Sequence, residues 1–270
     1  MGEGIRLPVL DGLGRTNRID KWWSQPVIMG SALILTLIYT FWRLFIYDVE
    51  ISYKLNGSKV VSPLFSPNIL EWDLFSLNQW AETAPSWINA AILIIWIPFG
   101  FRGTCYYMRR VYYRTFFASP TACWVDEPQI NKSIGYKGEK MVFIINNLHR
   151  YFLYAAMVIL LIKWWDVTHT MTFKNGIGIS VGTLVMAFEA FLLTMYVTSC
   201  HALRHLAGGV LDRWTVGISK FRGKLFKKIS ILNRSHGFWF WASLTFVFLG
   251  DLWVLGVNKG ILGDFAIFVI

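Results

Sequence analysis

Residues 181–205 read VGTLVMAFEAFLLTMYVTSCHALRH, an apolar run that ends in a thiol, two imidazoles and a guanidinium. A membrane-crossing helix needs about 20 mostly apolar residues, and this run has that length. Polar and ionisable groups are costly to leave unpaired near hydrocarbon, so a cluster of them indicates a functional site. The stretch therefore predicts a membrane helix with a functional site at its end, and a bound cofactor is the first candidate for that site.

The composition of the whole chain indicates an integral membrane protein. Of the 270 residues 55% are hydrophobic, and 14 Trp, 21 Phe and 11 Tyr lie outside the usual range of soluble domains. A net charge of +10 would suggest a nucleic-acid partner in a soluble chain, but membrane topology accounts for it here, so no nucleic acid is expected. Three cysteines argue against a disulfide framework and leave metal ligands or buried thiols as their roles.

Five segments are long and apolar enough to cross a membrane as helices. They lie at 26–47, 86–104, 141–163, 178–202 and 236–257. Pro98 and Gly100 predict a kink in the second segment, and Arg43 near the end of the first is expected to snorkel outward. The fold class is therefore an all-α integral membrane protein, a bundle of five transmembrane helices in a single domain over 1–270, with no internal repeat of the transporter kind.

The positions of lysine and arginine orient the bundle, because these residues collect in cytoplasmic loops. Nineteen of them lie in the N-terminal arm and in the regions 102–140 and 203–234, against five on the opposite side. The N-terminus and the loops 105–140 and 203–235 are thus expected in the cytoplasm, and the C-terminus outside. The connection 48–85 holds three prolines and is expected to cap the outer face.

On this topology, residue types that bind metals gather on the cytoplasmic side. His201 and His205 are spaced i, i+4 and share one helix face, whereas His169 stands apart on the outer side and is expected to have no ligand role. A plainer alternative for the pair is hydrogen bonding to loops or lipid headgroups. The candidate metal ligands are Cys105, Cys123, Cys200, His149, His201, His205 and His236.

Few membrane cofactors use imidazoles and thiolates together. A haem b would take two histidines on facing helices, such as His149 and His236, and needs no cysteine. A Rieske-type centre takes two cysteines on one iron and two histidines on the other. Zinc also accepts mixed ligands, and covalent haem attachment is excluded because no Cys-x-x-Cys-His motif is present. The residues alone leave both the haem and the cluster open.

Several phrases of the sequence resemble the single-chain membrane anchor of actinobacterial succinate dehydrogenases. They are RGTCYYMRR at 102–110, YYR at 112–114, SPTAC at 119–123, NLHRYF at 147–152, SCHALRH at 199–205, LNRSH at 232–236 and, on the outer side, SPLFSP at 62–67. The likeness runs from about residue 22 to the end of the chain. It implies a multi-pass subunit of succinate:quinone oxidoreductase, respiratory complex II, which links the tricarboxylic acid cycle to electron transport in the plasma (inner) membrane of a prokaryote.

The resemblance also implies partners and cofactors. A flavoprotein subunit with FAD would oxidise succinate, an iron-sulfur subunit would dock on the cytoplasmic face, and this anchor would pass electrons to a membrane quinone, menaquinone rather than ubiquinone. In this branch the anchor is associated with a Rieske-type 2Fe-2S cluster rather than haem b. Four of the seven candidates would be ligands, and Cys105 and Cys200 rank ahead of Cys123 because helix ends are better fixed than a loop.

One position departs from the family pattern. Members carry another cysteine between the two histidines of the phrase at 199–205, where this chain has Ala202 and Leu203. That position is therefore not a required ligand. The four cytoplasmic histidines stay unranked as ligands, and those that do not bind iron are expected to hydrogen-bond the cluster sulfurs or the quinone.

Quinone reduction requires polar groups near the two carbonyl oxygens as well as an electron donor. Candidates beside the metal ligands are Tyr106, Tyr107, Arg109, Arg150, Arg204 and Trp124. An interfacial belt that grips headgroups and the acidic surface of a partner is the alternative reading of this run. Glu189 and Asp251 lie deeper, where a proton path is conceivable and an interhelix hydrogen bond is the more ordinary role.

Two other functions stay open. The anchor would carry haem b on His149 and His236 or on the pair His201 and His205, or it would be purely structural and recruit soluble subunits without a redox centre of its own. A transporter is disfavoured, because the polar groups gather at one face rather than at the membrane midplane.

Overall fold

A computed structural model describes residues 21, 23–71, 76–85, 87–116, 141–209, 211–213, 215 and 217–270. Within them, four of the predicted segments are confirmed as helices long and apolar enough to cross a membrane, spanning Ser24–Ile46, Ile145–Thr170, Val181–Thr198 and His236–Asn258. The helices are α1 (Ser24–Phe41) with the π-helical turn η1 (Trp42–Ile46), α6 (His149–Thr170) after the 3-10 helix η4 (Met141–Leu148), α7 (Val181–Thr198) and α10 (His236–Asn258).

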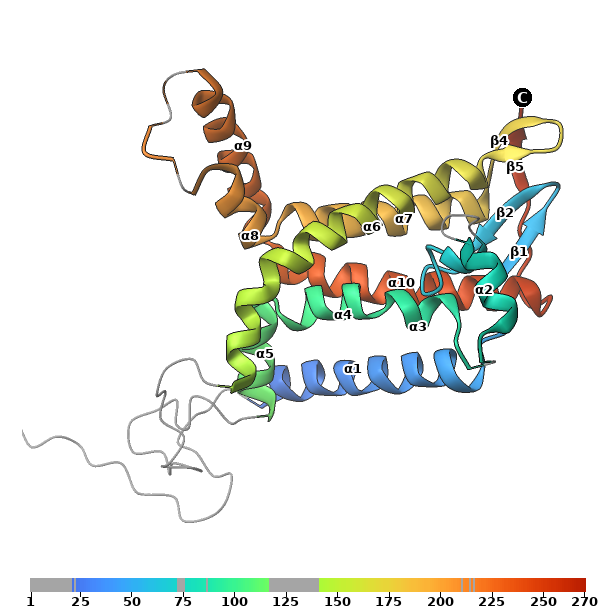
Figure 1. Cartoon of the computed structure of the whole chain (residues 1–270), viewed down its shortest axis with the longest axis horizontal. Coiled ribbons are helices and arrows are strands. Elements are labelled where there is room, and N and C mark those ends of the chain that lie inside the picture. The colour runs from blue at the N-terminus through green and yellow to red at the C-terminus, as the bar shows by residue number, and fades with distance from the viewer. Residues whose placement is uncertain are drawn as a thin grey trace, which may run out of the picture.

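The predicted second span, 86–104, is not one helix. It forms α3 (Ala90–Ile94) and α4 (Trp96–Gly103), which lie in line in Figure 1, and each is too short to cross a membrane alone. Pro98 has no amide hydrogen to donate to a preceding carbonyl, which accounts for the interruption of the helical ladder here. The bundle therefore has four long helices and one broken segment among the described residues, and five helical spans are not confirmed.

Helix α7 packs against both α6 and α10, and α6 in turn packs against α4. The contact between α4 and α6 is close, since a Cβ atom added to Gly100 would lie 2.1 Å from the ring of Phe152. Helix α7 begins at Ser180, whose hydroxyl accepts the amide of Thr183 at 3.1 Å and so caps the first turn.

One end of the bundle, called here the sheet end, carries the strands (Figure 1). Strands β1 (Ser52–Leu55) and β2 (Ser58–Val61) form an antiparallel hairpin whose turn residues Asn56 and Gly57 both have positive φ. Strands β3 (Thr172–Phe173), β4 (Gly176–Ser180) and β5 (Ala266–Val269) form a second sheet in that order. The segment 48–85 also holds the 3-10 helix η2 (Ile69–Glu71) and helix α2 (Leu77–Thr83).

The opposite end, called here the thiol end, carries short helices outside the bundle. Helix α5 (Tyr106–Phe116) follows α4, and α7 is followed by α8 (His201–Arg204), the π-helical turn η5 (His205–Gly209) and α9 (Gly217–Asn233). Figure 1 shows α9 projecting away from the four long helices. Arg222 attaches α9 to η5 by donating hydrogen bonds to the carbonyl oxygens of Ala207 at 2.9 Å and Leu206 at 2.8 Å.

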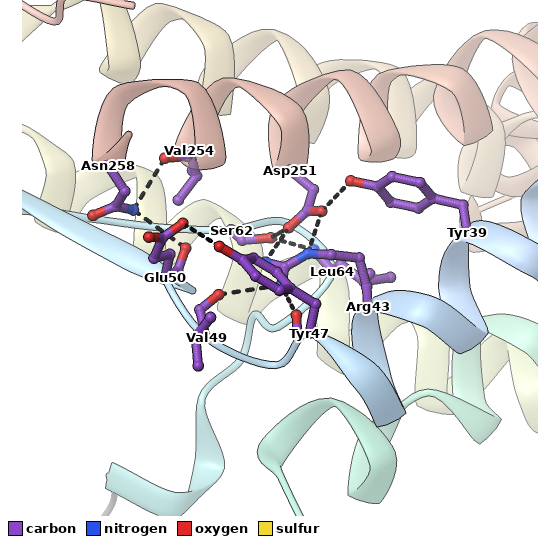
Figure 2. A network of polar contacts seen from close by, with 10 residues as sticks. All are labelled: Tyr39, Arg43, Tyr47, Val49, Glu50, Ser62, Leu64, Asp251, Val254 and Asn258. Atoms are coloured by element: carbon purple, nitrogen blue, oxygen red, sulfur yellow. Dashed lines mark hydrogen bonds and ion pairs between the residues drawn. The ribbon is translucent and has the colours of Figure 1, made fainter. Parts of the chain in front are cut away.

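The expectation that Arg43 snorkels outward is wrong. Its side chain is fully buried and forms a two-pronged ion pair with Asp251 of α10, Nε to Oδ2 at 2.7 Å and Nη2 to Oδ1 at 3.0 Å (Figure 2). Tyr39 and Ser62 donate to the same carboxylate, each at 2.5 Å. A bidentate guanidinium and two hydroxyls satisfy this buried charge, so burial replaces snorkelling at this position. Asp251 thus has the ordinary interhelix role.

Candidate functional site

Two helix breaks lie at the thiol end, and each holds a hydroxyl residue followed by a cysteine. Helix α4 ends at Gly103, and Thr104 and Cys105 connect it to α5. Helix α7 ends at Thr198, and Ser199 and Cys200 connect it to α8. Both thiols are free and buried, with 3% of Cys105 and 1% of Cys200 exposed.

Each thiol meets a histidine that begins a long helix. The Cys200 sulfur lies 3.1 Å from Nε2 of His149 at the start of α6, and the Cys105 sulfur lies 3.3 Å from Nε2 of His236 at the start of α10. Both histidines are buried as well. Four of the seven predicted ligands therefore form two buried Cys–His pairs, contributed by four different parts of the bundle.

The other ring nitrogen of each histidine contacts a hydroxyl. Thr104 Oγ1 lies 3.0 Å from Nδ1 of His149, and Ser199 Oγ lies 2.7 Å from Nδ1 of His236. Each hydroxyl proton is already donated to a helix carbonyl, that of Gly100 at 2.6 Å and that of Tyr196 at 2.9 Å. This arrangement favours the tautomer in which Nδ1–H donates to the hydroxyl oxygen, and that tautomer leaves the lone pair of Nε2 for the thiol or a metal.

Aromatic rings and amides hold the two halves in matching ways. Phe101 stacks on His149 at 4.7 Å between ring centroids, and Tyr196 stacks on His236 at 5.1 Å. Asn146 donates to the carbonyl oxygen of Thr104 at 2.8 Å, and Asn233 donates to that of Ser199 at 2.7 Å. The site thus consists of two similar halves, one from 101–149 and one from 196–236. Each histidine is held by residues of its own half and contacts the thiol of the other half.

This duplication has a signal in the sequence that the search for long repeats missed. An aromatic residue is followed after two residues by a hydroxyl residue and a cysteine, and further along the chain an asparagine stands three residues before a histidine. The first copy is Phe101, Thr104, Cys105, Asn146 and His149, and the second is Tyr196, Ser199, Cys200, Asn233 and His236. Because α4 and α7 both run toward the thiol end and α6 and α10 both start there, the two copies have the same orientation.

The remaining ligand candidates lie elsewhere. His201 is exposed, and its ring lies edge-to-face with that of Tyr106, with 6.3 Å between the ring centroids. His205 is half-buried in η5, and among the described contacts neither histidine is hydrogen-bonded to a thiol. Cys123 lies outside the described residues, as does the quinone candidate Trp124.

The described residues hold no group of three or more His, Cys, Asp or Glu side chains that could bind one metal ion. A Rieske-type cluster places two cysteines on one iron and two histidines on the other, so these four residues would hold it as Cys105 with Cys200 and His149 with His236. Burial raises the pKa of the Cys200 thiol to about 12, so this thiol stays protonated unless a bound cation replaces its proton.

Two of the quinone candidates lie beside the Cys–His pairs. Tyr106 is exposed, and its ring centroid is 6.3 Å from that of His149. The ring centroid of Tyr107 is 6.4 Å from that of His236, and its hydroxyl accepts a hydrogen bond from Trp241 at 3.0 Å. Arg204 has a different contact, donating to Ser230 of α9 at 2.8 Å. Arg109 lies over the ring of Tyr113 at 5.4 Å, and Arg150 is exposed at the start of α6.

Comparisons with known proteins agree on one family. The model of the actinobacterial succinate dehydrogenase subunit SdhC matches residues 24–260. Among solved structures, a chain of the Mycobacterium smegmatis Sdh1 complex in the apo form is 30% identical in sequence, and the alignment covers 99% of each chain with a TM-score of 0.78. No protein with a curated description matches the chain. The matched region contains both copies of the site.

Proposed function

Because this chain belongs to the family of actinobacterial succinate dehydrogenase SdhC subunits, we propose that it is the membrane anchor that passes electrons to quinone through a Rieske-type 2Fe-2S centre. Cys105, Cys200, His149 and His236 would hold this centre, which when bound supplies a one-electron carrier. The observation that supports this most strongly is the pair of buried Cys–His contacts, in which a thiol sulfur lies 3.1 and 3.3 Å from a histidine Nε2 atom.

The donor set fits the proposed group. A Rieske-type cluster takes two cysteines and two histidines, and the site offers two of each. In the two copies of the site, Cys105 corresponds to Cys200 and His149 corresponds to His236. This equivalence matches a cluster that has both cysteines on one iron and both histidines on the other. A haem b between His149 and His236 would leave two buried thiols without a role, so the cluster is the better proposal.

The quinone would bind on the exposed side of the histidines. Tyr106 is the exposed polar group that contacts the edges of both His149 and His201, so its hydroxyl is placed to donate to a quinone carbonyl. Tyr107 is engaged with Trp241, and Arg204 attaches α9, which makes them supports of the site wall. Menaquinone is the proposed quinone, and Arg109, Arg150 and Trp124 remain candidates to line its site.

The basic thiol end would face the cytoplasm and bind the soluble subunits. Helix α9, which ends three residues before His236, carries Lys220, Arg222, Lys224, Lys227 and Lys228. An iron-sulfur subunit docked there would bring electrons from an FAD-containing flavoprotein to the buried site. The sheet end would then face the outside of a prokaryotic plasma membrane, as lysine and arginine counts predict.

The cofactor can be tested in the purified complex. We expect chemical analysis to find two more irons than the soluble iron-sulfur subunit holds, and electron paramagnetic resonance of the reduced complex to show a Rieske-type signal without haem absorption bands. A complex that reduces quinone but shows neither signal would contradict the metal centre and favour the structural anchor. Haem bands that depend on His149 would instead favour the haem alternative.

The two hydroxyls provide a finer test of the site. Replacing both Thr104 by Val and Ser199 by Ala removes the acceptors that fix the histidine tautomers, so we expect cluster occupancy to fall, with metal affinity reduced about 10- to 100-fold. Occupancy is measured by the intensity of the Rieske-type signal. Thr198→Val is the matched control, because its hydroxyl donates to Thr194 and Met195 carbonyls and not to a histidine. Equal loss in the control would show a helix defect instead.

A further inference from the structure

A cavity of about 380 Å³ lies between α1 and the helices α4, α6, α7 and α10, and exposed side chains such as Leu37 and Phe116 form part of its wall. Near the sheet end its wall includes Ser66 and Lys163. Toward the thiol end its wall includes Phe101 and Tyr196, the two rings that stack on His149 and His236. The cavity therefore connects the region of the sheets with the back of the Cys–His pairs.

Most of this cavity is apolar, but two residues that line it have a buried polar atom without a hydrogen-bond partner. Among the described residues these atoms are Oγ1 of Thr40 and Oε1 of Glu189. Unpaired polar atoms of this kind are partners for internal water, which needs two to four polar groups around it.

Glu189 is the ionisable group in the middle of this space. Its Oε2 pairs with Nζ of Lys163 at 3.5 Å, and both side chains are at least nine-tenths buried. The charged groups around it are Lys163 and Asp166 of α6 and Arg102 of α4. Glu189 stands eleven residues before Cys200 on α7, about 16 Å along the helix axis, so it lies well inside the membrane-crossing part. Intramembrane carboxylates at such positions are used as proton relays.

The sheet end supplies an entrance to this path. Asp166 is half-buried and accepts a hydrogen bond from the hydroxyl of Ser66, which lines the cavity. Lys163 lies one turn from Asp166 and donates to the carbonyl of Pro63 at 2.9 Å. Polar groups thus follow one another from the partly exposed Asp166 to Glu189, and the cavity continues from there to Tyr196.

We propose that this cavity is a hydrated proton path, in which Glu189 relays protons from the aqueous phase at the sheet end to the quinone reduced at the thiol end. The inference rests on the proposed function. Each quinone takes two electrons from succinate through the complex and two protons, which form an O–H bond at each carbonyl oxygen. Glu189 gives its proton to cavity water and regains one from the side of Asp166, so its own state is unchanged after each turnover.

The test uses the whole complex in sealed vesicles with a pH indicator inside. Succinate added outside reaches only complexes whose soluble subunits face outward, so the sheet end of every active complex faces the lumen. With a short-chain quinone as acceptor, we expect the lumen to become more alkaline by up to two protons per quinone reduced. Glu189→Gln should abolish this change and slow quinone reduction at least tenfold, while succinate oxidation by a soluble dye stays at the wild-type rate.

Glu71→Gln is the matched control, because this carboxylate pairs with Lys59 on the outside of the sheet end and does not line the cavity. It should behave as the wild type. Quinone reduction by the wild type without any luminal pH change would overturn the path and leave the redox role intact, as would a normal luminal change in Glu189→Gln. If Glu189→Gln does not assemble, Ser66→Ala at the entrance should slow the luminal change instead. A wild-type complex that reduces no quinone would refute the proposed function itself.

Discussion

Replacing His149 and His236 together with alanine is expected to abolish succinate-to-quinone electron transfer. Both imidazoles place Nε2 next to a buried thiol, so their removal leaves the proposed site with two cysteines and no histidine for a two-iron cluster. The flavoprotein and the soluble iron-sulfur subunit do not contain these residues. Succinate oxidation by a soluble acceptor should therefore persist, and the Rieske-type signal should disappear. The two assays are run on the same purified complex.

The matched control is His201→Ala combined with His205→Ala. These imidazoles lie at the same end of the bundle but are more exposed than the first pair. We expect the control to keep its Rieske-type signal, although quinone affinity is expected to fall because His201 contacts Tyr106. Loss of the signal in the control and its survival in the first variant would show that the ligand assignment is reversed.

The sequence predicted the long helices well because their signal is a simple one. About 20 apolar residues in a row have few other uses, and four such runs became helices of the expected position. The prediction of one continuous helix over 86–104 was not confirmed, because hydropathy carries no information on backbone hydrogen bonding. Pro98 removes a backbone donor inside it, and the chain forms two short helices instead.

The sequence predicted which residue types form the candidate site and at which end of the bundle they lie, but it did not rank the histidines. Residue type and topology placed seven Cys and His residues at one end, and helix periodicity drew attention to His201 and His205, which share a face. The structure buries a different pair, His149 and His236 at the starts of α6 and α10. Choosing them from sequence would have required the short duplicated pattern, in which an aromatic residue and a hydroxyl precede each cysteine.

The burial of Arg43 could not be predicted from the sequence, for a different reason. A lone arginine near a helix end usually reaches water, and its partner Asp251 lies 208 residues away in the chain. Pairing at such a distance depends on the fold that brings α1 beside α10. No local pattern around either residue announces it.

Replacing Asp251 by Asn is expected to destabilise the assembled chain by about 3–5 kcal/mol, because it leaves the buried guanidinium of Arg43 without its counter-charge. The large contacts of α1 are with α5 at the thiol end, so at the sheet end this pair is its main polar attachment to the bundle (Figure 2). Differential scanning calorimetry of the purified complex in detergent measures the effect as a lower unfolding temperature.

Two comparisons separate the loss of a buried pair from a general effect of mutation. Glu71→Gln breaks the exposed pair with Lys59, where about 0–1 kcal/mol is expected. Arg43→Met combined with Asp251→Leu removes both buried charges, and much of the stability should return, since well-packed apolar residues often replace such pairs without loss. The double variant also removes the hydrogen bonds of Tyr39 and Ser62 to Asp251 and those of Arg43 to backbone carbonyls. If it were as unstable as Asp251→Asn, these hydrogen bonds would stabilise the position of α1 more than the ion pair does.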